Sequence, residues 1–321
     1  MYTFSQLSTI IEEELGKIVY PKTPQKLYQP IDYVMGLGGK RMRPILLLMA
    51  HQLFDEDIEK AISPALGIEF FHNFTLLHDD IMDNAKIRRG RQTVHQKWNK
   101  NVAILSGDTM LVQAYQLLSN VDKNIVKDLI TLFSKSATKV CEGQQWDMDF
   151  ETQKEVTLQE YLKMIEYKTA VLLATSLQIG GITANTSKEN QNNLYHFGLN
   201  MGIAFQLKDD FLDVFGNLDE FGKQIGGDII ANKKTFLYLK AFQLANESQK
   251  QDLHKFFNTN EDSEEKVTHV KTIFIDLDIP RHTKDMMKAY YTKAIRHLDA
   301  IDSNNKAPLI VFSEKLIERI S

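Results

Sequence analysis

The sequence predicts an all-α protein, a single large helical bundle whose helices pack side by side around a central core or cavity. Of its seven prolines, none falls between Pro64 and Pro280. Because proline disrupts helix interiors, its absence over so long a stretch indicates long uninterrupted helices. Apolar residues also recur at steps of three and four, as on one face of a helix, while alternating β-type runs are scarce.

Five apolar segments show this helical spacing in chain order. They cover residues 66–81, 105–118, 125–133, 162–173 and 194–215. Breaks between helices are expected in regions rich in turn-forming residues. These regions are residues 21–30, 84–91, 180–190, 217–234 and 259–265. None of them resembles a long flexible linker, so we expect one domain over residues 1–321.

The composition is typical of a soluble globular protein, with 43% hydrophobic and 25% charged residues. A net charge of −4 excludes a generally basic surface for nucleic acid, and the one cysteine excludes an intrachain disulfide. Residues 12–14 are all Glu where a secretory signal would need a basic start. The longest apolar run, residues 45–50, is far shorter than the roughly 20 residues that cross a bilayer. We therefore expect a cytoplasmic protein without a transmembrane segment.

One acidic pattern occurs twice and is the most specific feature of the sequence. Residues 78–83 read H-D-D-I-M-D and residues 208–213 read K-D-D-F-L-D, each in an apolar helical segment. Positions i and i+4 share a helix face, so carboxylates lie close together and repel unless cations neutralise them. Oxygen-only ligands of this kind suit Mg²⁺. A solvated acidic turn could explain one copy, but two copies favour a shared metal centre, built from Asp79, Asp80, Asp83, Asp209, Asp210 and Asp213.

Two basic clusters accompany the acidic motifs. Residues 38–44 read G-G-K-R-M-R-P, and residues 86–91 read K-I-R-R-G-R. Arginine binds phosphate oxygens through its planar fork, and a glycine pair lets the backbone approach a ligand closely. Either cluster alone could be an ordinary exposed loop. Beside two acidic motifs, they indicate two anionic groups near the metals.

On these motifs the sequence resembles the trans-isoprenyl diphosphate synthases of the polyprenyl synthetase family. Residues 143–147 resemble its G-Q-x-x-D segment, residues 168–169 its K-T pair and residues 205–206 its F-Q pair. The resemblance implies a bundle of the isoprenoid synthase type, with the substrate cavity at its centre. It also implies a homodimer, and several Mg²⁺ ions per active site that bridge the allylic diphosphate.

The resemblance further implies roles for individual residues. For isopentenyl diphosphate, the matching binding residues are Lys40, Arg43, His72 and Arg89. For the allylic diphosphate, they are Arg88, Gln144, Lys223 and Lys233. The catalytic residues, whose dipoles would stabilise an allylic cation, are Lys168, Thr169 and Gln206. Phe74 matches an aromatic at the floor of the product pocket, and the small Thr75, one turn from Asp79, leaves that pocket partly open.

The implied reaction is head-to-tail condensation of isopentenyl diphosphate with an allylic diphosphate. Mg²⁺ held by Asp79, Asp83 and Asp209 would clamp the allylic diphosphate while pyrophosphate leaves. Phe74, together with the lack of a two-residue insertion in the first acidic motif, favours a short product, geranylgeranyl or farnesyl diphosphate. A longer-chain polyprenyl diphosphate synthase is the alternative.

Three other functions fit the motifs less well. A class I terpene cyclase would carry a mixed Asn/Ser/Glu second motif, and a non-catalytic partner subunit would have lost its acidic motifs. An HD-type phosphohydrolase could use His72 and His78, but it would not need the second acidic motif. Two departures from the family pattern are Gln92, where many relatives have proline, and Asn232, where many have glycine. Both are expected to affect loop stiffness more than chemistry.

Overall fold

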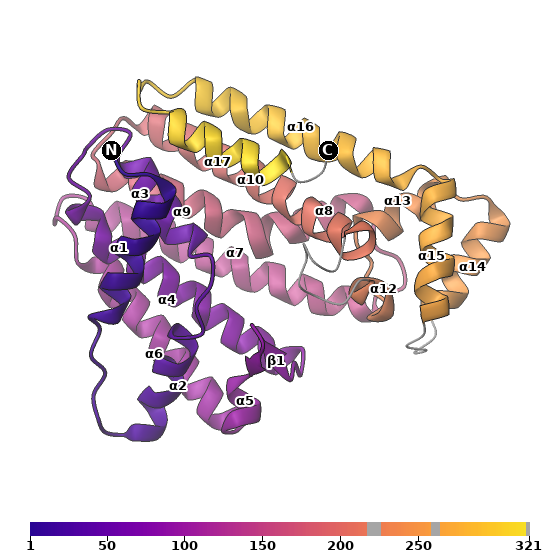
Figure 1. Ribbon diagram of the computed structural model, residues 1–321, viewed down its shortest axis with the longest axis horizontal. Helices are drawn as coiled ribbons and strands as arrows, with labels where there is room; N and C mark the ends of the chain where they lie inside the picture. Colours follow the sequence, from indigo (N-terminus) through magenta and orange to yellow (C-terminus); the bar gives the residue numbers. More distant parts are fainter. Residues whose placement is uncertain (217–225, 258–263, 319–321) are drawn as a thin grey trace. The chain divides into compact units, whose positions relative to one another are not determined.

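The computed structural model describes residues 1–216, 226–257 and 264–318, and in these residues a single two-stranded hairpin accompanies the helices (Figure 1). The all-α prediction is therefore confirmed. The chain divides into two compact units, each assembled from three segments. Unit 1 comprises residues 1–134, 175–194 and 301–309, and unit 2 comprises residues 135–174, 195–300 and 310–321. One domain over residues 1–321 remains a prediction.

The elements are distributed between the units as follows. Unit 1 contains α1 (Phe4–Gly16), α2 (Gln25–Met35), α3 (Met42–His51), α4 (Glu59–Met82), β1 (Ile87–Arg88), β2 (Arg91–Gln92), α5 (Val94–Lys97) and α6 (Lys100–Ser119). Unit 2 contains α8 (Leu158–Ile165), the π-helix η1 (Glu166–Ala170), α12 (Gly227–Ile230), α13 (Phe236–Leu244), α14 (Glu247–Phe257), α15 (Glu264–Asp276) and α16 (Ile279–Asp299). Both units receive residues from α7 (Val126–Thr152), α9 (Val171–Thr183), α10 (Lys188–Phe215) and α17 (Ala307–Glu318).

The five apolar segments fall in helices, except that Ile125 precedes α7, but several expected breaks are wrong in extent. The breaks expected over residues 217–234 and 259–265 lie partly outside the described residues, and their described parts contain α12 and the start of α15. Residues 21–30 were expected to be a break, whereas α2 begins at Gln25 and contains Pro30. Proline inside a helix removes one backbone hydrogen bond, and the buried Pro30, Ile31 and Val34 offset that loss by packing. The break expected over residues 180–190 is shorter, because α9 continues to Thr183 and α10 begins at Lys188.

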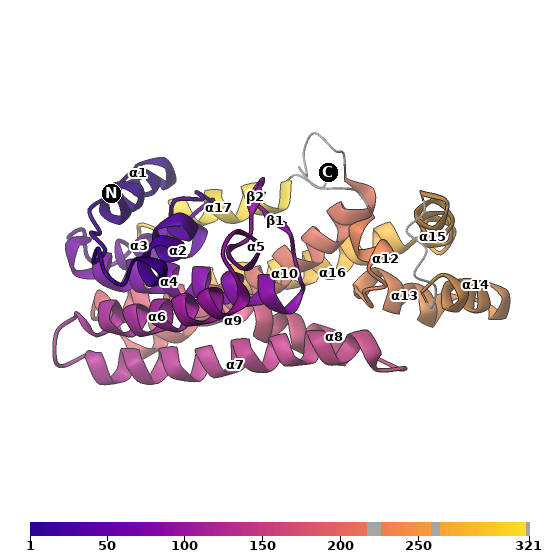
Figure 2. The same ribbon diagram turned by 90° about the horizontal axis from the view of Figure 1, so that it is seen from below.

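The core of unit 1 forms around α3, α4 and α6. Figure 2 shows α6 lying along α4, and the two helices are in extensive contact. Residues 45–50, the longest apolar run, are the fully buried centre of α3. This packing fixes the last turn of α4, which carries the first acidic motif.

The core of unit 2 is shared by several helices. Buried apolar side chains from α8, α10, α13 and α15 form one cluster, including Ile165, Leu207, Phe236 and Phe274. The second acidic motif lies on the last turns of α10, so this core holds it against α8. None of the helices in the described residues is apolar over a length that could cross a membrane.

Candidate functional site

The first acidic motif divides its aspartates between two environments. Asp80 is buried, and Arg88 Nε donates to its Oδ1 at 2.7 Å. Burial raises the pKa of Asp80, and the positive charge of Arg88 opposes that rise. Asp79 is half-buried and Asp83, at the C-cap of α4, is exposed. Asp79 and Asp83, at positions i and i+4, share one face of the helix.

The hairpin that follows α4 fixes the second basic cluster. Its two turn residues, Arg89 and Gly90, have φ values of 50° and 74°, which is typical of a tight two-residue turn. Tyr33 Oη donates to the backbone carbonyl of Gln92 at 2.8 Å and ties the hairpin to α2. Gln92 pairs with Ile87 in the two-stranded ladder, and the expected effect of this residue on loop stiffness remains a prediction.

Three of the residues predicted to bind isopentenyl diphosphate lie in unit 1 as one basic cluster. Arg43 Nη1 lies 3.1 Å from His72 Nε2, and Arg89 donates to the carbonyl of Gly38. A Cβ on Gly39 would come within 2.9 Å of the Arg89 guanidinium, so the glycine makes room for this arginine. Burial lowers the pKa of Arg43 to about 10, and burial beside arginines lowers the pKa of His72 well below its usual value. His72 therefore stays neutral and accepts from Arg43.

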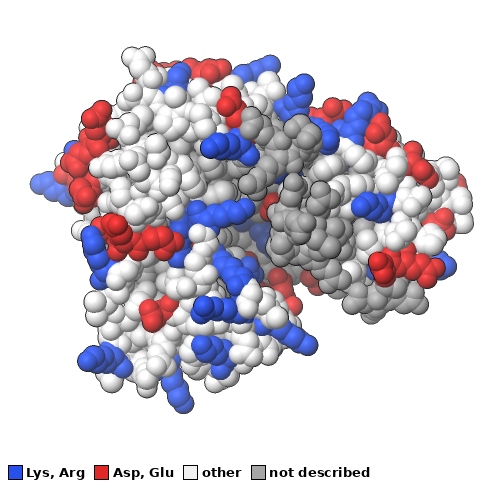
Figure 3. Space-filling model, viewed as in Figure 1, with Lys and Arg blue, Asp and Glu red and all other residues white. Residues whose placement is uncertain are grey.

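Lys40, the fourth predicted residue, is exposed directly before α3. Figure 3 shows Lys and Arg side chains gathered over the part of unit 1 that carries the hairpin and α5. Arg43 Nε is buried and has no hydrogen-bond partner among the described residues. A buried donor of this kind is costly unless an anion binds to it, so the cluster is suited to a diphosphate.

Arg41 has a function in the fold that its motif did not reveal. It adopts φ 43° at the N-cap of α3, and its Nη1 donates to Glu69 Oε1 at 2.8 Å. Arg41 Nε donates to Glu12 at 2.8 Å and Nη2 to the carbonyl of Met35 at 2.6 Å. The side chains of Arg41 and Glu69 are only 1% and 2% exposed. A glutamate on the buried side of an apolar helix was the sequence signal that could have revealed this pair.

The two predicted chain-length residues lie on α4, one turn before the first acidic motif. Phe74 is half-buried, with its ring centroid 5.6 Å from that of Phe71 and 4.7 Å from that of His78. Thr75 Oγ1 donates to the carbonyl of His72 at 2.8 Å. Phe74 therefore belongs to a row of aromatic rings along α4, and its role at a pocket floor remains a prediction.

The second acidic motif also has a buried middle aspartate. Tyr161 Oη donates to Asp210 Oδ2, and Gln206 Nε2 donates to Asp210 Oδ1 at 3.1 Å. Burial raises the pKa of Asp210 to about 8, Asp228 adds to the rise, and the two hydrogen bonds oppose it. Asp213 is buried as well, and its Oδ2 accepts from the backbone of Asp228 at 3.0 Å. Asp209 is half-buried at the start of the motif.

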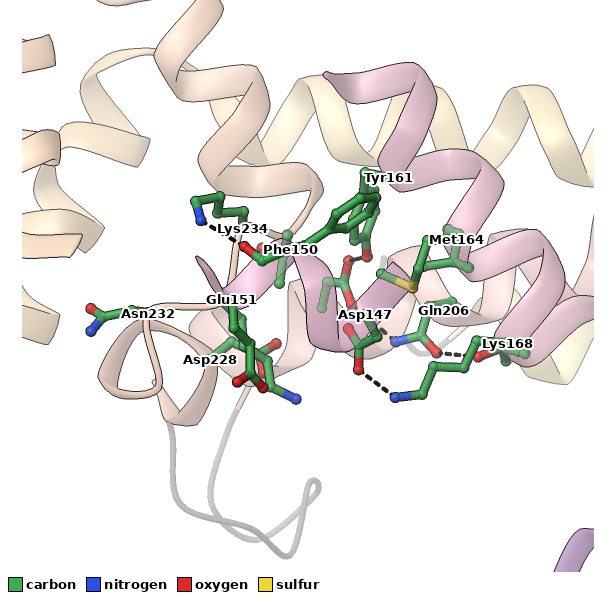
Figure 4. Close-up of a pocket in the computed structure, with 15 residues that line it drawn as sticks. Asp147, Phe150, Glu151, Tyr161, Met164, Lys168, Gln206, Asp228, Asn232 and Lys234 are labelled. Carbon is green, nitrogen blue, oxygen red and sulfur yellow. Dashed lines mark hydrogen bonds and ion pairs between the residues drawn. The ribbon is translucent and has the colours of Figure 1, made fainter. Parts of the chain in front are cut away.

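The predicted catalytic residues line one pocket of unit 2 (Figure 4). Lys168 and Thr169 belong to η1, and π-helical turns of this kind are frequent at functional sites. Lys168 Nζ pairs with Asp147, and Thr169 Oγ1 donates to Gln206 Oε1 at 3.0 Å. The pocket encloses about 640 Å³ of empty space, part of it open to solvent. Its lining also includes Asp210, Asp228 and residues 232–235.

A glycine in the predicted G-Q-x-x-D segment allows α7 to approach η1. A Cβ on Gly143 would lie 2.3 Å from the backbone nitrogen of Lys168, so any larger residue would displace the π-helical turn. Gln144, the next residue, is buried on α7. Lys233 lines the pocket, whereas Lys223 lies outside the described residues.

Each acidic motif can supply only part of a metal site. In residues 1–216, 226–257 and 264–318, no three His, Cys, Asp or Glu side chains gather in a group that could hold a metal ion. Mg²⁺, however, is commonly bound by one or two carboxylates together with substrate phosphates and waters. Asp79 and Asp83 in unit 1, and Asp209 in unit 2, fit that pattern as oxygen ligands.

The chain matches known proteins over most of its length. The family model for polyprenyl synthetase matches residues 24–274. A geranylgeranyl diphosphate synthase of Methanosarcina mazei is 35% identical over 315 residues, which cover 97% of this chain and 95% of the relative. A crystal structure of geranylgeranyl pyrophosphate synthase has a TM-score of 0.95 at 43% identity and covers 100% of both chains. A polyprenyl synthase of Caulobacter crescentus CB15, crystallised with calcium and isoprenyl diphosphate, has a TM-score of 0.83 at 25% identity and covers 98% of this chain and 94% of that one.

These similarities define the class of the protein as an all-α enzyme with the isoprenoid synthase fold. The chain belongs to the polyprenyl synthetase family. It is a trans-prenyltransferase that uses isoprenyl diphosphates, as its motifs predicted.

Proposed function

We propose that the enzyme joins isopentenyl diphosphate head-to-tail to an allylic diphosphate and releases pyrophosphate and a short-chain product, geranylgeranyl or farnesyl diphosphate. The observation that carries this proposal is the pocket of unit 2, where Asp210 of the second acidic motif lies with Lys168, Thr169, Gln206 and Lys233. The lysine ammonium groups in such a pocket can bind a diphosphate. The neutral dipoles can stabilise the positive charge on the carbon from which the diphosphate departs.

The allylic diphosphate is proposed to bind through Arg88, Gln144, Lys168, Lys223 and Lys233. As the bond to the leaving group breaks, positive charge develops on the allylic carbon. The Thr169 hydroxyl donates its hydrogen bond to Gln206 Oε1, so the lone pairs of the hydroxyl oxygen can face that charge. Gln206 is held in turn by its bond to Asp210. The three side chains thereby fix the orientation of the dipoles before the reaction begins.

The isopentenyl diphosphate is proposed to bind to Lys40, Arg43, His72 and Arg89. The buried Arg43 Nε supports this assignment, because an incoming phosphate oxygen would accept from it. Binding there would hold the double bond at the reacting carbon, which is a positioning role. Released pyrophosphate is proposed to accept the proton that the condensation sets free.

Asp79, Asp83 and Asp209 are proposed to hold Mg²⁺, with several ions per site. Bound there, Mg²⁺ would neutralise the allylic diphosphate and stabilise pyrophosphate as the leaving group. Calcium and isoprenyl diphosphate in the relative from C. crescentus support a hard divalent cation at such a site. Asp80, Asp210 and Asp213 each accept a hydrogen bond from another part of the protein. They are proposed to hold the two acidic motifs in position.

The test is to incubate the pure protein with Mg²⁺ and isopentenyl diphosphate and to size the products. Dimethylallyl, geranyl and farnesyl diphosphates are supplied separately as primers. We expect pyrophosphate release that requires both substrates, and a short product. Long products would keep the class of enzyme and contradict the product length. No condensation by the folded protein with any primer would favour the partner subunit.

The product length gives a first testable prediction. Replacing Phe74 by Ala removes the aromatic ring that is proposed to form the pocket floor, so the variant is expected to make longer products than the wild type. Chromatographic sizing of the products measures this change. Phe242→Ala, which removes a half-buried ring on α13, is the control and is expected to leave the product unchanged. Unchanged products from the Phe74 variant would assign that ring to the core alone.

The homodimer gives a second prediction. The helix α6 exposes three large apolar side chains, Ile104, Leu105 and Val112, at 44%, 58% and 57%. Leu105 and Val112 lie two turns apart on one face, as is typical of a protein contact. We expect light scattering to give twice the chain mass for the wild type and the single chain mass for a Leu105→Glu/Val112→Glu variant. A wild-type monomer would contradict the dimer.

The alternative functions have less support. His72 accepts from Arg43, and His78 Nε2 lies 3.2 Å from the carbonyl of Ile104, so both histidines of an HD-type hydrolase are engaged by other groups. The second acidic motif retains all three aspartates, unlike that expected for a terpene cyclase. We also propose that the enzyme acts in the cytoplasm.

A further inference from the structure

The short helix α12 ends in a turn that explains one departure from the family pattern. Asn232 N donates to the carbonyl of Ile229 at 3.1 Å, and Lys233 N donates to that of Asp228 at 2.9 Å. These two bonds, with Asn232 at φ 56°, form a Schellman motif, in which the left-handed position favours glycine and, after it, asparagine. The asparagine therefore stands at a position that requires a left-handed backbone, where many relatives have glycine.

A buried lysine holds this asparagine. Lys266, on α15, is only 1% exposed, and its Nζ donates to Asn232 Oδ1 at 2.6 Å. Its ammonium also lies 5.9 Å from the centroid of the Phe257 ring. Burying an ammonium group is costly, so a neutral apolar side chain would be the simpler choice for a purely structural position. The hydrogen bond from Lys266 connects α15 to Asn232, which lines the pocket.

The rest of the segment is fixed by other helices of unit 2. A Cβ on Gly226 would lie 2.6 Å from Val267, so α15 also contacts the beginning of the segment. Lys234 Nζ donates to the carbonyl of Phe150, in the last turn of α7, at 2.7 Å (Figure 4). It also donates to the carbonyl of Gln153, just after α7, at 2.9 Å. The two neighbours of Lys233 are thus each held by a side-chain hydrogen bond.

We propose that Lys266 is a positioning residue for Lys233, acting through Asn232. Its hydrogen bond holds Asn232 in the left-handed conformation, and the backbone then directs Lys233 into the pocket. Glycine at the same position could adopt the turn without help, but it would leave more conformational freedom to be lost when the diphosphate binds. This proposal rests on the proposed function, in which Lys233 binds the allylic diphosphate.

The experiment compares steady-state kinetics of the full-length enzyme and its Lys266→Met variant. Loss of one charged hydrogen bond is expected to raise KM for the allylic diphosphate by about tenfold, with KM for isopentenyl diphosphate changed by less than about twofold. Lys266→Gln keeps a donor and is expected to recover most of the affinity. Lys271→Met, on the same helix but half-exposed, is the control and is expected to behave as the wild type.

A double variant separates positioning from general stability. In an Asn232→Gly background, Lys266→Met is expected to change KM for the allylic diphosphate much less than in the wild type, because the hydrogen bond is already absent. Equal changes in both KM values, or a lower Tm with unchanged KM, would overturn the proposal. If the wild type fails to condense its substrates, the proposed function fails first. Calorimetry would then measure the affinity of each protein for inorganic pyrophosphate. Weaker binding by Lys266→Met would support the role of Lys266, and equal affinity of the wild type and the variant would reject it.

Discussion

Replacement of Asp79 by Asn is expected to lower kcat/KM by on the order of a thousandfold, or about 4 kcal/mol of transition-state stabilisation. The amide keeps the size of the side chain and removes the negative charge that is proposed to hold Mg²⁺. The carbon–oxygen bond of the allylic substrate would then break without full stabilisation of departing pyrophosphate. Pyrophosphate release at increasing Mg²⁺ concentrations measures the loss, and the variant is expected to require more Mg²⁺ than the wild type.

Asp108→Asn is the matched control for this change. Asp108 is an exposed carboxylate on α6, 4.0 Å from His78 Nε2, and is expected to contribute little to the reaction. A chelator should abolish activity of the wild type, and added Mg²⁺ should restore it. An Asp79→Asn enzyme with wild-type kcat/KM and Mg²⁺ requirement would remove Asp79 from the metal site.

Replacement of Arg41 by Met is expected to lower the free energy of unfolding by about 3–5 kcal/mol. The variant leaves the buried Glu69 carboxylate without the guanidinium that pairs with it at 2.8 Å. An unpaired charge in such a position costs far more than the loss of an exposed contact. Urea unfolding followed by circular dichroism gives the free energy directly.

Two further variants test whether the buried charge is the cause. Arg41→Met/Glu69→Gln removes both charges and is expected to recover part of the lost stability, because the glutamine still accepts from Asn73. Arg281→Met breaks an exposed ion pair with Asp278 and is expected to cost less than about 1 kcal/mol. Additive losses in the double variant would show that Arg41 stabilises the fold mainly through its other partners.

The helices could be predicted from the sequence because hydrophobic periodicity is a local property. The apolar segments at residues 66–81 and 194–215 fall within α4 and α10, which carry the two acidic motifs. The start of α2 could not be predicted, since Pro30 is tolerated only because tertiary packing offsets the lost hydrogen bond. Tertiary packing, which depends on distant segments, decides such cases.

The acidic motifs can be located from the sequence, but the hydrogen-bond partners of their aspartates cannot. Spacing alone put Asp79 beside Asp83, yet it could not show that Arg88 engages Asp80 or that Tyr161 engages Asp210. Those partners come from other elements, so no local pattern encodes them. Lys266 lies 34 residues from Asn232 and has the appearance of any helix lysine until its burial is known.

The π-helical turn η1 has a consequence for how the chain can tolerate insertions and deletions. A wider turn holds an extra residue between α8 and α9, so the two helices are rotated relative to each other compared with one continuous α-helix. Forcing the same residues into a regular α-helix would rotate those before the turn by about 100° relative to those after it. Tyr161 would then face away from Asp210 while Leu172 kept its place in the core. Deleting one residue within 166–170 would instead leave a regular α-helix with both faces nearly in place, because the wide turn takes up one residue. The helix can therefore carry one more residue at the pocket than a regular helix of the same reach.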